Sequence, residues 1–386
     1  MQIVVHYAEI GLKGRNRPRF EQRLRQHLQA ALDACGGGGI SNLYGRLLLE
    51  TAAGTPFDAL AERLRRVFGV AFFSRVSSSE PTLEGLEKLV DEFVGEREFE
   101  SFGVRTRRVD KRHPWKSEEL NRLLGARIQA LTGARVDLNR PDLWVELHLL
   151  SRRALLLHER VPGPGGMPVG SAGRMISLIS GGIDSPAASY LMLKRGAELS
   201  YLHFHSAPYT SSASQEKVRE LVARLAAWQG PATLHTIPFG ELQRELVSEA
   251  PAAPRIVLYR RFMLRIAERL AKRERALGLV TGESLGQVSS QTLGNLDTIG
   301  RAATLPLLRP LIGMDKAEIV DLAERIGTYE ISIEPDEDCC SYLMPRSPAT
   351  WSRPGDLEAI ERELDVEGLV EASLARGTRE RIDPPA

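Results

Sequence analysis

The chain has 386 residues, 42% of them hydrophobic and 26% charged, which is typical of a globular protein with two or three domains. It has no run of 18 apolar residues, no signal-peptide pattern and only three cysteines, so we expect a cytoplasmic protein and exclude a membrane span and a disulfide framework. The net charge of +1 combines a basic surplus over residues 1–170 with an acidic surplus over residues 171–386, which hints at a nucleic-acid substrate.

The first 160 residues predict two small segments that mix strands and helices. Residues 1–76 have the order β-α-β-α-β, which is typical of a ferredoxin-like unit; the strands are expected at 3–7, 43–50 and 69–76, and the helices at 17–34 and 57–67. Four consecutive glycines at 36–39 predict a flexible break. The second segment predicts helices at 83–93 and 117–132 and strands at 101–107, 143–149 and 153–159. A stretch rich in Pro and Gly at 161–170 predicts a linker.

A basic run lies between a predicted strand and the helix at 117–132. It holds six cations and one aromatic residue: Arg105, Arg107, Arg108, Lys111, Arg112, Lys116 and Trp115. Cations suit contact with phosphates and an aromatic ring suits base stacking, so the run is a candidate RNA-binding segment. A solvated loop explains the same residues equally well. Arg15, Arg17 and Arg19 form a second, weaker candidate.

From residue 171 the pattern alternates between strand and helix. Strands are expected at 175–180, 199–205, 232–238 and 278–282, and helices at 186–195, 214–229, 255–276 and 315–327. This alternation predicts a parallel sheet with helices on both faces, which binds nucleotides at the carboxyl ends of its strands. Ser180, His203 and Gly282 lie at the carboxyl ends of three of these strands, so we expect them to converge. The residues after 346 predict a short polar tail.

The segment from Ser180 to Ser185 reads Ser-Gly-Gly-Ile-Asp-Ser and separates a predicted strand from a predicted helix. Gly181 and Gly182 leave backbone N–H groups open to an anion, and the two serines add hydroxyl donors. Asp184 would repel a phosphate unless a metal ion or a reacting group needs its carboxylate. The segment is neither a Walker A loop nor a Rossmann fingerprint, because the required Gly-Lys-Ser/Thr and G-x-G-x-x-G spacings are absent. A plain glycine turn is the alternative.

The Ser180–Ser185 segment resembles the pyrophosphate loop of adenylating ATP pyrophosphatases. Further segments resemble the tRNA 4-thiouridine synthetases, also called tRNA sulfurtransferases; these segments are Tyr7–Gly14, Gly282–Leu293, Arg309–Lys316 and Ile331–Cys340. The resemblance runs in order from about residue 6 to residue 345. About 40 residues follow Cys340, so we expect the variant of this family that lacks a C-terminal rhodanese domain.

The resemblance implies an α/β protein with three domains and a tail. These are a ferredoxin-like domain at 1–76, an RNA-binding THUMP domain at 77–165, a doubly wound parallel-sheet ATP pyrophosphatase (PP-loop) domain at 171–345 and a C-terminal tail at 346–386. The implied reaction uses ATP to adenylate the C4 oxygen of a tRNA uridine at position eight, after which persulfide sulfur displaces AMP. The implied partners are tRNA, Mg²⁺, a cysteine desulfurase and a small carrier protein of thiamine thiazole synthesis. A homodimer is compatible with the resemblance.

The resemblance also assigns residues to the ATP site. They are Leu178, Ile179, Ser180, Gly181, Gly182, Asp184, Ser185, His203, Phe204, Arg260, Gly282 and Gln291. Asp184 matches a catalytic position, where a carboxylate can act through Mg²⁺. Lys316 matches a lysine near the phosphates, but a solvated lysine after the helix cap Asp315 is the alternative.

Three of these assignments carry a physical argument or an open alternative. A missing side chain at Gly282 lets a ligand approach the backbone. Arg260 adjoins Arg261, so either arginine can be the one at the site. His203 and His205 share one face of a strand, but no third ligand is evident, so no metal site is expected.

Cys340 aligns with the reactive cysteine of the family, whereas Cys339 stands where members vary. We expect Cys340 to accept a persulfide, although the three acidic residues before the pair should raise the thiol pKa, so activation must come from elsewhere. Two small buried hydrophobic residues are the alternative interpretation. An iron–sulfur cluster is not expected, because Cys35 is distant and most simply inert.

Three rival functions are weighed against this one. An amide-forming synthetase would need an amidotransferase nucleophile, which is not evident. An RNA-binding protein without catalysis is disfavoured by the intact Ser180, Asp184, Ser185 and Cys340. A sulfur carrier that serves only thiamine synthesis would have the same adenylating site, so the sequence leaves that alternative open.

Overall fold

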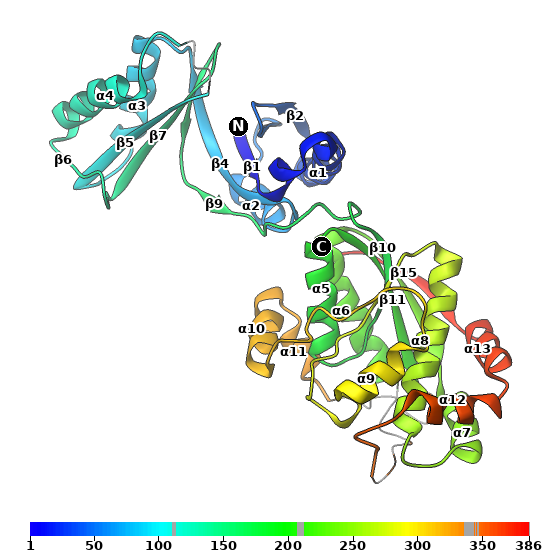
Figure 1. The fold of residues 1–386 in the computed structure, drawn as a ribbon. Helices are drawn as coiled ribbons and strands as arrows, with labels where there is room; N and C mark the ends of the chain where they lie inside the picture. The colour runs from blue at the N-terminus through cyan, green and yellow to red at the C-terminus, as the bar shows by residue number, and fades with distance from the viewer. Residues whose placement is uncertain (110–112, 207–211, 336–342, 344, 346, 386) are drawn as a thin grey trace. The chain divides into compact units, whose positions relative to one another are not determined.

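The computed structural model describes the chain except residues 110–112, 207–211, 336–342, 344, 346 and 386. The chain divides into two compact units, Met1–Gly166 and Met167–Ala386, each with its own β-sheet (Figure 1). Among the described residues, no helix is long and apolar enough to cross a membrane.

The first part of the N-terminal unit has the ferredoxin-like order β-α-β-β-α-β. Its elements are β1 (Gln2–Tyr7), α1 (Arg17–Asp33), β2 (Gly38–Asn42), β3 (Leu47–Thr51), α2 (Phe57–Leu64) and β4 (Val70–Ser79). Strand β1 lies between β3 and β4 and is antiparallel to both. The apolar residues of β1 and β3 are buried, with Ile3, Val4 and Leu48 fully covered. The ferredoxin-like fold predicted for this segment is therefore confirmed.

Strand β2 corrects the prediction of a flexible break at residues 36–39. Gly38 and Gly39 pair with Thr51 and Glu50 of β3. A Cβ atom at Gly38 would lie 2.3 Å from the carbonyl oxygen of Glu50, so any other residue would push the two strands apart. The sequence pattern missed this strand because glycine is depleted in strands, and here it serves a close approach of two backbones.

The second part of the N-terminal unit extends the same sheet. It contains α3 (Leu83–Gly95), β5 (Ser101–Arg108), α4 (Ser117–Thr132), β6 (Arg135–Val136), β7 (Leu143–Leu149) and β8 (Ala154–Leu157). The sheet order is β2-β3-β1-β4-β8-β7-β5-β6, and β9 (Val161–Pro162), at the start of the predicted linker, pairs with β4. Helices α3 and α4 cover this half with a core that includes Leu86, Leu124 and Val145. The long strand β4 thus belongs to both halves, and the predicted boundary at residue 76 falls within it.

The C-terminal unit is built on a sheet of order β14-β13-β10-β11-β12-β15, in which all neighbours are parallel except β15. Its strands are β10 (Gly173–Leu178), β11 (Ala197–His205), β12 (Ala232–Pro238), β13 (Leu279–Val280), β14 (Leu307–Leu308) and β15 (Thr378–Ile382). Its principal helices are α5 (Asp184–Lys194), α6 (Ala213–Gln229), α7 (Gly240–Glu249), α8 (Arg255–Glu274), α9 (Leu293–Gly300) and α10 (Lys316–Ile326), with a short α11 (Tyr329–Ser332). The chain runs outward from β10 in both directions, so β10 is the point where the strand order reverses. The predicted doubly wound fold is confirmed, and such a reversal point is where these sheets bind ligands.

Residues 354–382 correct the prediction of a short polar tail. They form α12 (Pro354–Arg362), α13 (Val366–Ala375) and β15, and β15 pairs antiparallel with β12. Arg261 of α8, which is 1% exposed, donates to both carboxylate oxygens of Glu361 at 2.7 and 2.6 Å. Leu357 and Leu374 join the core of the unit. The segment is rich in charge because its helices dock through arginine–glutamate pairs as well as through apolar contacts.

Candidate nucleotide-binding site

The Ser180–Ser185 segment lies between the carboxyl end of β10 and the start of α5. The hydroxyl of Ser185 accepts a hydrogen bond from the backbone N–H of Ser180 at 2.9 Å and lies 3.2 Å from the Ser180 hydroxyl. The N–H of Gly182 donates to the Ser180 hydroxyl at 3.4 Å. The two serines therefore hold the shape of the turn, and the positive end of the 11-residue helix α5 faces it.

The Asp184 carboxylate is held by two groups from a distant part of the chain. The Lys316 ammonium donates to Oδ1 at 2.7 Å, and the Gln287 amide donates to Oδ2 at 2.9 Å. The side chains of Asp184 and Lys316 are 23% and 49% exposed, so the pair is open to a ligand. The structure thus brings together Asp184 and Lys316 and adds Gln287, which the sequence did not single out although it lies in a segment that carries the resemblance.

Lys316 is the first residue of α10, and its backbone is fixed by a capping box. The Asp315 carboxylate accepts from the Glu318 N–H at 2.9 Å, and the Glu318 carboxylate accepts from the Asp315 N–H at 3.0 Å. The predicted cap at Asp315 is confirmed. Lys316 is not simply a solvated lysine at the start of a helix, because its ammonium binds the Asp184 carboxylate of α5.

A second charged cluster surrounds Glu283, whose side chain is 5% exposed. Its carboxylate accepts from Arg260 at 3.2 Å, from Arg309 at 2.8 Å and from the Thr281 hydroxyl. Two guanidinium groups share one carboxylate, so the cluster keeps a positive charge. Glu283 and Arg309 were not predicted as site residues, because their pairing joins positions 26 residues apart.

The two neighbouring arginines, Arg260 and Arg261, have different partners. Arg261 is buried in the pair with Glu361, whereas Arg260 turns toward Glu283. Of the two, Arg260 is the one on the side of the sheet ends.

Gly282 differs from the sequence-based interpretation. A Cβ atom there would lie 2.8 Å from the Ser185 nitrogen and 2.9 Å from its Cα. The space beside Gly282 is therefore filled by the start of α5, and is not left open for a ligand. The glycine is needed because the strand end and the loop pack backbone against backbone.

The remaining predicted ATP residues line the ends of β10 and β11. The Ile179 N–H donates to the Leu202 carbonyl at 2.9 Å, and the His203 Nδ1 lies 3.1 Å from the Ile179 carbonyl oxygen. The Phe204 ring packs edge-on against Phe239 at 5.3 Å between centroids. Leu178 is half-buried and packs against the core of the unit.

Gln291 is 6% exposed. Its side-chain carbonyl oxygen is buried without a hydrogen-bond partner among the described residues. A buried acceptor of this kind normally has a partner, so it is a candidate contact for a bound group.

Metal-ligand clusters are absent from the part of the chain that the structure describes: no group of three or more His, Cys, Asp and Glu is placed to hold an ion. Burial lowers the pKa of His205. Magnesium commonly takes one or two carboxylates together with substrate phosphates and water. Asp184 offers one carboxylate at the loop, and this donor set fits that mode of binding.

The cysteine pair Cys339 and Cys340 lies outside the described residues, as do the three acidic residues before it. Cys35 is a free, half-buried thiol in the N-terminal unit.

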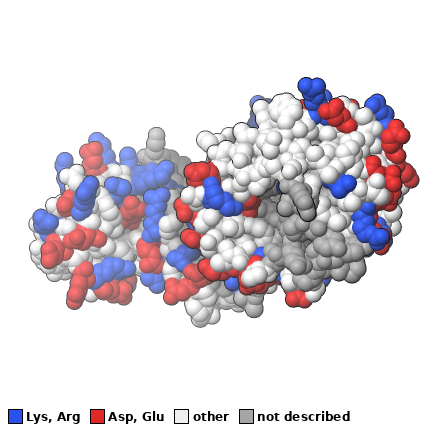
Figure 2. Space-filling view, turned by 90° about the horizontal axis from the view of Figure 1, so that it is seen from below, with Lys and Arg blue, Asp and Glu red and all other residues white. Residues whose placement is uncertain are grey.

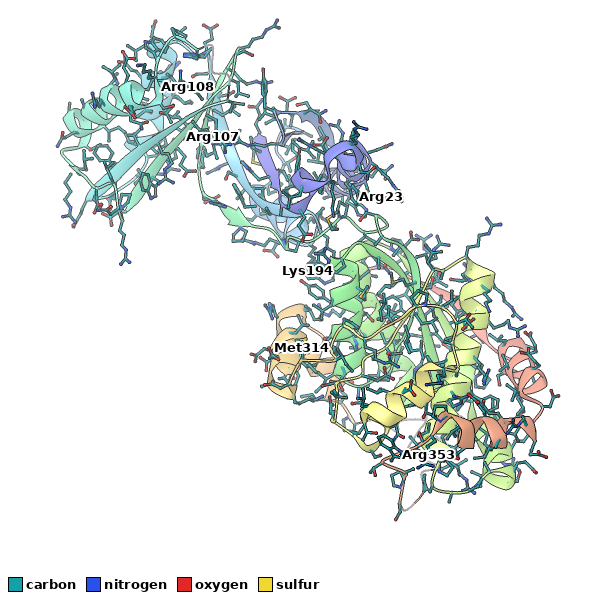
Figure 3. All side chains as sticks on the ribbon, viewed as in Figure 1. Arg23, Arg107, Arg108, Lys194, Met314 and Arg353 are labelled. Carbon is teal, nitrogen blue, oxygen red and sulfur yellow. The ribbon has the colours of Figure 1, made fainter. Side chains whose placement is uncertain are left out.

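The candidate RNA-binding residues lie on the N-terminal unit, where Lys and Arg side chains stand beside acidic ones (Figure 2). Arg105 and Arg107 alternate along β5 and share one face; Arg105 lies 4.2 Å from the Trp144 ring and 3.6 Å from Glu146. Arg108, labelled with Arg107 in Figure 3, donates to the Trp115 carbonyl at 3.2 Å.

The other members of the basic run differ in their surroundings. Trp115 packs against the core under α3 and α4, so part of its ring is committed to the fold. Lys116 is exposed before α4, and Lys111 and Arg112 lie outside the described residues. In the weaker patch, Arg17 is tied to Glu21 at 2.7 Å and to the Tyr7 hydroxyl.

Comparison with known proteins extends over the whole chain. Residues 2–74 match the ThiI ferredoxin-like domain, residues 80–159 the THUMP domain, and residues 170–366 the family described as Thiamine biosynthesis protein (ThiI). A probable tRNA sulfurtransferase of Brevibacillus brevis is 42% identical, over 98% of this chain and 96% of that protein. One of Thermus thermophilus is 45% identical, over 96% and 91%. A crystal structure of a 4-thiouridine synthetase–RNA complex with bound ATP superposes with a TM-score of 0.90 at 36% identity, covering 99% of both chains.

Proposed function

Because the chain belongs to the ThiI family of tRNA sulfurtransferases, we propose that it is a tRNA uridine 4-sulfurtransferase that uses ATP to convert a tRNA uridine into 4-thiouridine. The observation that supports this function best is the 2.7 Å contact between Lys316 and Asp184. It joins an ammonium and a carboxylate that are 132 residues apart in the chain, beside a turn suited to phosphates.

The first proposed step is adenylation of the uridine at position eight. The C4 oxygen attacks the α-phosphorus of ATP, a new O–P bond forms, and pyrophosphate leaves with the electron pair of the broken P–O bond. Negative charge develops on the leaving pyrophosphate, so positive groups and N–H donors at that point lower the barrier. Lys316 and the N–H groups of Gly181 and Gly182 supply them.

Asp184 has two roles in this proposal. Before ATP binds, it holds the Lys316 ammonium in place; when the phosphates arrive, they compete for that ammonium and free the carboxylate. Mg²⁺, when bound, neutralises phosphate charge, and Asp184 is the residue that would hold it. The Arg260–Glu283–Arg309 cluster keeps a second positive charge at the strand ends.

We propose that the adenosine part of ATP lies along the ends of β10 and β11. Leu178 is half-buried there, whereas Ile179, His203 and Phe204 are buried, so the adenosine would lie against Leu178 and the backbone of these residues. The buried carbonyl oxygen of Gln291 would accept a hydrogen bond from an amino or hydroxyl group of the nucleotide.

The second proposed step replaces the activated oxygen with sulfur. A cysteine desulfurase passes a persulfide to Cys340, the terminal sulfur attacks C4, and AMP leaves with the former C4 oxygen. A thiol then attacks the resulting S–S bond, which gives 4-thiouridine and a disulfide, so the two electrons come from that thiol. Cys340→Ser should abolish thiolation, whereas Cys339→Ser, the matched control, should retain it.

The decisive experiment is thionucleoside analysis of an unmodified tRNA transcript after incubation with the protein, ATP, Mg²⁺, a thiol reductant, a cysteine desulfurase and cysteine. We expect 4-thiouridine, lost in Asp184→Ala and Lys316→Ala and kept in Lys88→Ala, which removes only a surface ion pair at 4.0 Å. AMP and pyrophosphate without thiolated base would mean that adenylation serves another acceptor.

We extend the proposal to sulfur transfer onto a small carrier protein for the thiazole of thiamine, because the description of the matching family is Thiamine biosynthesis protein (ThiI). The same adenylating site would serve both acceptors. Mass spectrometry of a candidate carrier after incubation with ATP, desulfurase and this protein should detect an added sulfur, and an unchanged mass would restrict the activity to tRNA.

A further inference from the structure

A cavity of about 360 Å³ opens on the sheet of the N-terminal unit, where its two halves join. It is lined by residues from five strands and from the segment before β9: His6, Phe72, Arg105, Arg107, Glu146, His148, Leu157 and Arg160. The strand register puts these residues on one face, since His6 pairs with Phe72, and Arg105 and Arg107 pair with Glu146 and His148.

The cavity carries far more positive than negative groups. Its one lining carboxylate, Glu146, is compensated by Arg105 at 3.6 Å. Among the described residues, neither Arg107 nor Arg160 has a carboxylate within ion-pair distance, and Arg160 lies over the Phe72 ring at 3.6 Å. Arg46, which is 8% exposed, adds a buried cation behind His148.

Arg46 fixes the tautomer of His148. Its guanidinium can only donate, so the Nδ1 of His148, 2.8 Å away, accepts. The proton of the neutral ring must then be on Nε2, which makes this nitrogen a hydrogen-bond donor. Burial, Arg46 and Arg107 lower the pKa of His148 to about 3, so the ring stays neutral at physiological pH.

His6 is the second imidazole of the cavity. It stacks on Phe72 at 4.0 Å, and its Nε2 is buried without a hydrogen-bond partner among the described residues. Burial lowers the pKa of His6 to about 3, together with the charges of Arg46, Arg160 and Arg107. Nearby arginines keep both imidazoles neutral, and the cavity has an excess of positive charge. This combination suits a negatively charged ligand.

We propose that this cavity binds a phosphate group of the tRNA backbone. Arg107 and Arg160 neutralise it, because guanidinium forks match the oxygen geometry of phosphate, and the Nε2–H of His148 donates to a third oxygen. The cavity is of the size that holds small molecules, so the phosphate enters with part of its ribose. The assignment rests on the proposed function only in taking RNA as the source of the phosphate.

The test measures binding of an unmodified tRNA transcript to the full-length protein by fluorescence anisotropy over a range of salt concentrations. Arg107→Gln/Arg160→Gln should weaken binding at least tenfold and make the slope of log K against log salt shallower by about one, as expected for one lost phosphate contact. The matched control is Arg135→Gln/Arg140→Gln, which removes two exposed arginines of the same unit, one in β6 and one just before β7, and should leave the slope closer to wild type.

A second variant separates charge from geometry and guards against misfolding. Arg107→Lys/Arg160→Lys keeps both charges, so the slope should return while affinity stays below wild type. Equal affinity and slope in wild type and the Gln variant would overturn the proposal. So would equal losses in the Gln variant and in the control.

Inorganic phosphate distinguishes the two sources of the ligand. At equal ionic strength, phosphate should displace RNA from wild type better than chloride does, and this excess should vanish in Arg107→Gln/Arg160→Gln. If phosphate perturbs the His148 ring signals in NMR spectra while the variant binds RNA normally, the cavity takes free phosphate and the RNA assignment is wrong. Thiolation does not enter these measurements, so failure of the proposed enzymatic activity would be recognised separately.

Discussion

The two units hold their positive charges in opposite ways. At the strand ends of the C-terminal unit, each cluster contains a carboxylate: Asp184 binds Lys316, and Glu283 binds Arg260 and Arg309. In the cavity of the N-terminal unit, Arg107 and Arg160 face neutral imidazoles, and the one lining carboxylate among the described residues, Glu146, pairs with Arg105. Both surroundings suit phosphates, but only the first can exchange one negative partner for another.

This difference distinguishes a catalytic site from a site that only binds its ligand. A site that transfers a phosphoryl group must stabilise charge that moves during the reaction, and a carboxylate can retain the cations until the substrate replaces it. A site that grips an RNA backbone needs only a fixed excess of positive charge. The predictions below test whether the carboxylates matter at one place and the histidines at the other.

The largest effect is expected for Asp184→Asn. The amide keeps the size of the side chain but removes the charge that binds Lys316 and would hold Mg²⁺. We expect the rate of AMP formation to fall by roughly 10²–10³-fold, the usual loss when one charge-stabilising group is removed. Quenched-flow measurement of AMP release checks this, and a loss confined to the KM for tRNA would assign Asp184 to binding instead.

Gly282→Ala should have the next largest effect. The added methyl group would lie 2.8 Å from the Ser185 nitrogen and must displace the start of α5. A shift of about 1 Å near reacting groups can cost roughly 10²-fold in rate. Activity should therefore drop while tRNA affinity is unchanged. Gly313→Ala is the control, because a Cβ there meets nothing within 4 Å; equal activity of the two variants would contradict the packing argument.

Glu283→Gln should act through the two arginines. The amide still accepts from one donor, but it leaves two partly buried guanidinium groups without a countercharge. We expect a rise of about tenfold in the KM for ATP and a modest loss of stability, since removal of one partner of a buried ion pair is costly. Steady-state kinetics and thermal unfolding separate the two. A lower KM would mean that Glu283 competes with ATP for the arginines.

Local pattern was enough to predict the ends of the strands and the Ser180–Ser185 turn. A strand, two glycines and a helix start are neighbours in sequence, so their geometry follows from a few residues. The same reasoning located β10, β11 and β12 within a few residues of their observed bounds. It failed for β2, whose glycines are explained only by the partner strand, and for α12, α13 and β15, whose charged faces bind distant helices.

The sequence pattern did not predict which distant residues bind the side chains of each site. Gln287 meets Asp184 from 103 residues away, and Arg46 meets His148 from 102 residues away. Residue type alone did not indicate that His148 is held neutral or that Glu283 is buried. The first residues of the basic run, Arg105 to Arg108, lie on β5, but the cavity also needs His6 and Arg160 from the two ends of the N-terminal unit.

The smallest expected effect is a loss of stability at low pH that depends on two histidines. His6 and His148 have a pKa of about 3 in the folded protein against an ordinary value of 6.5, so between these values the unfolded chain binds protons that the folded chain does not. Their contribution to stability is therefore complete above pH 6.5 and declines as the pH falls toward 3, by up to about 1.4 kcal/mol per pH unit for each group. Glu274 of the C-terminal unit loses its contribution to stability at lower pH than the histidines do. The hydrogen bond from His235 lowers the pKa of Glu274 from 4.5 to about 2, so this contribution declines only below pH 4.5.

Thermal unfolding at pH 7 and pH 5 isolates the histidine contribution. His148→Gln keeps an acceptor for Arg46 but cannot titrate, so its melting temperature should fall less between the two pH values than that of wild type. Lys88→Ala should fall as much as wild type does. Equal falls in wild type and His148→Gln would mean that His148 is already protonated in the folded protein. The cavity would then carry a further fixed charge, and the contrast between a neutral and a compensated site would no longer hold.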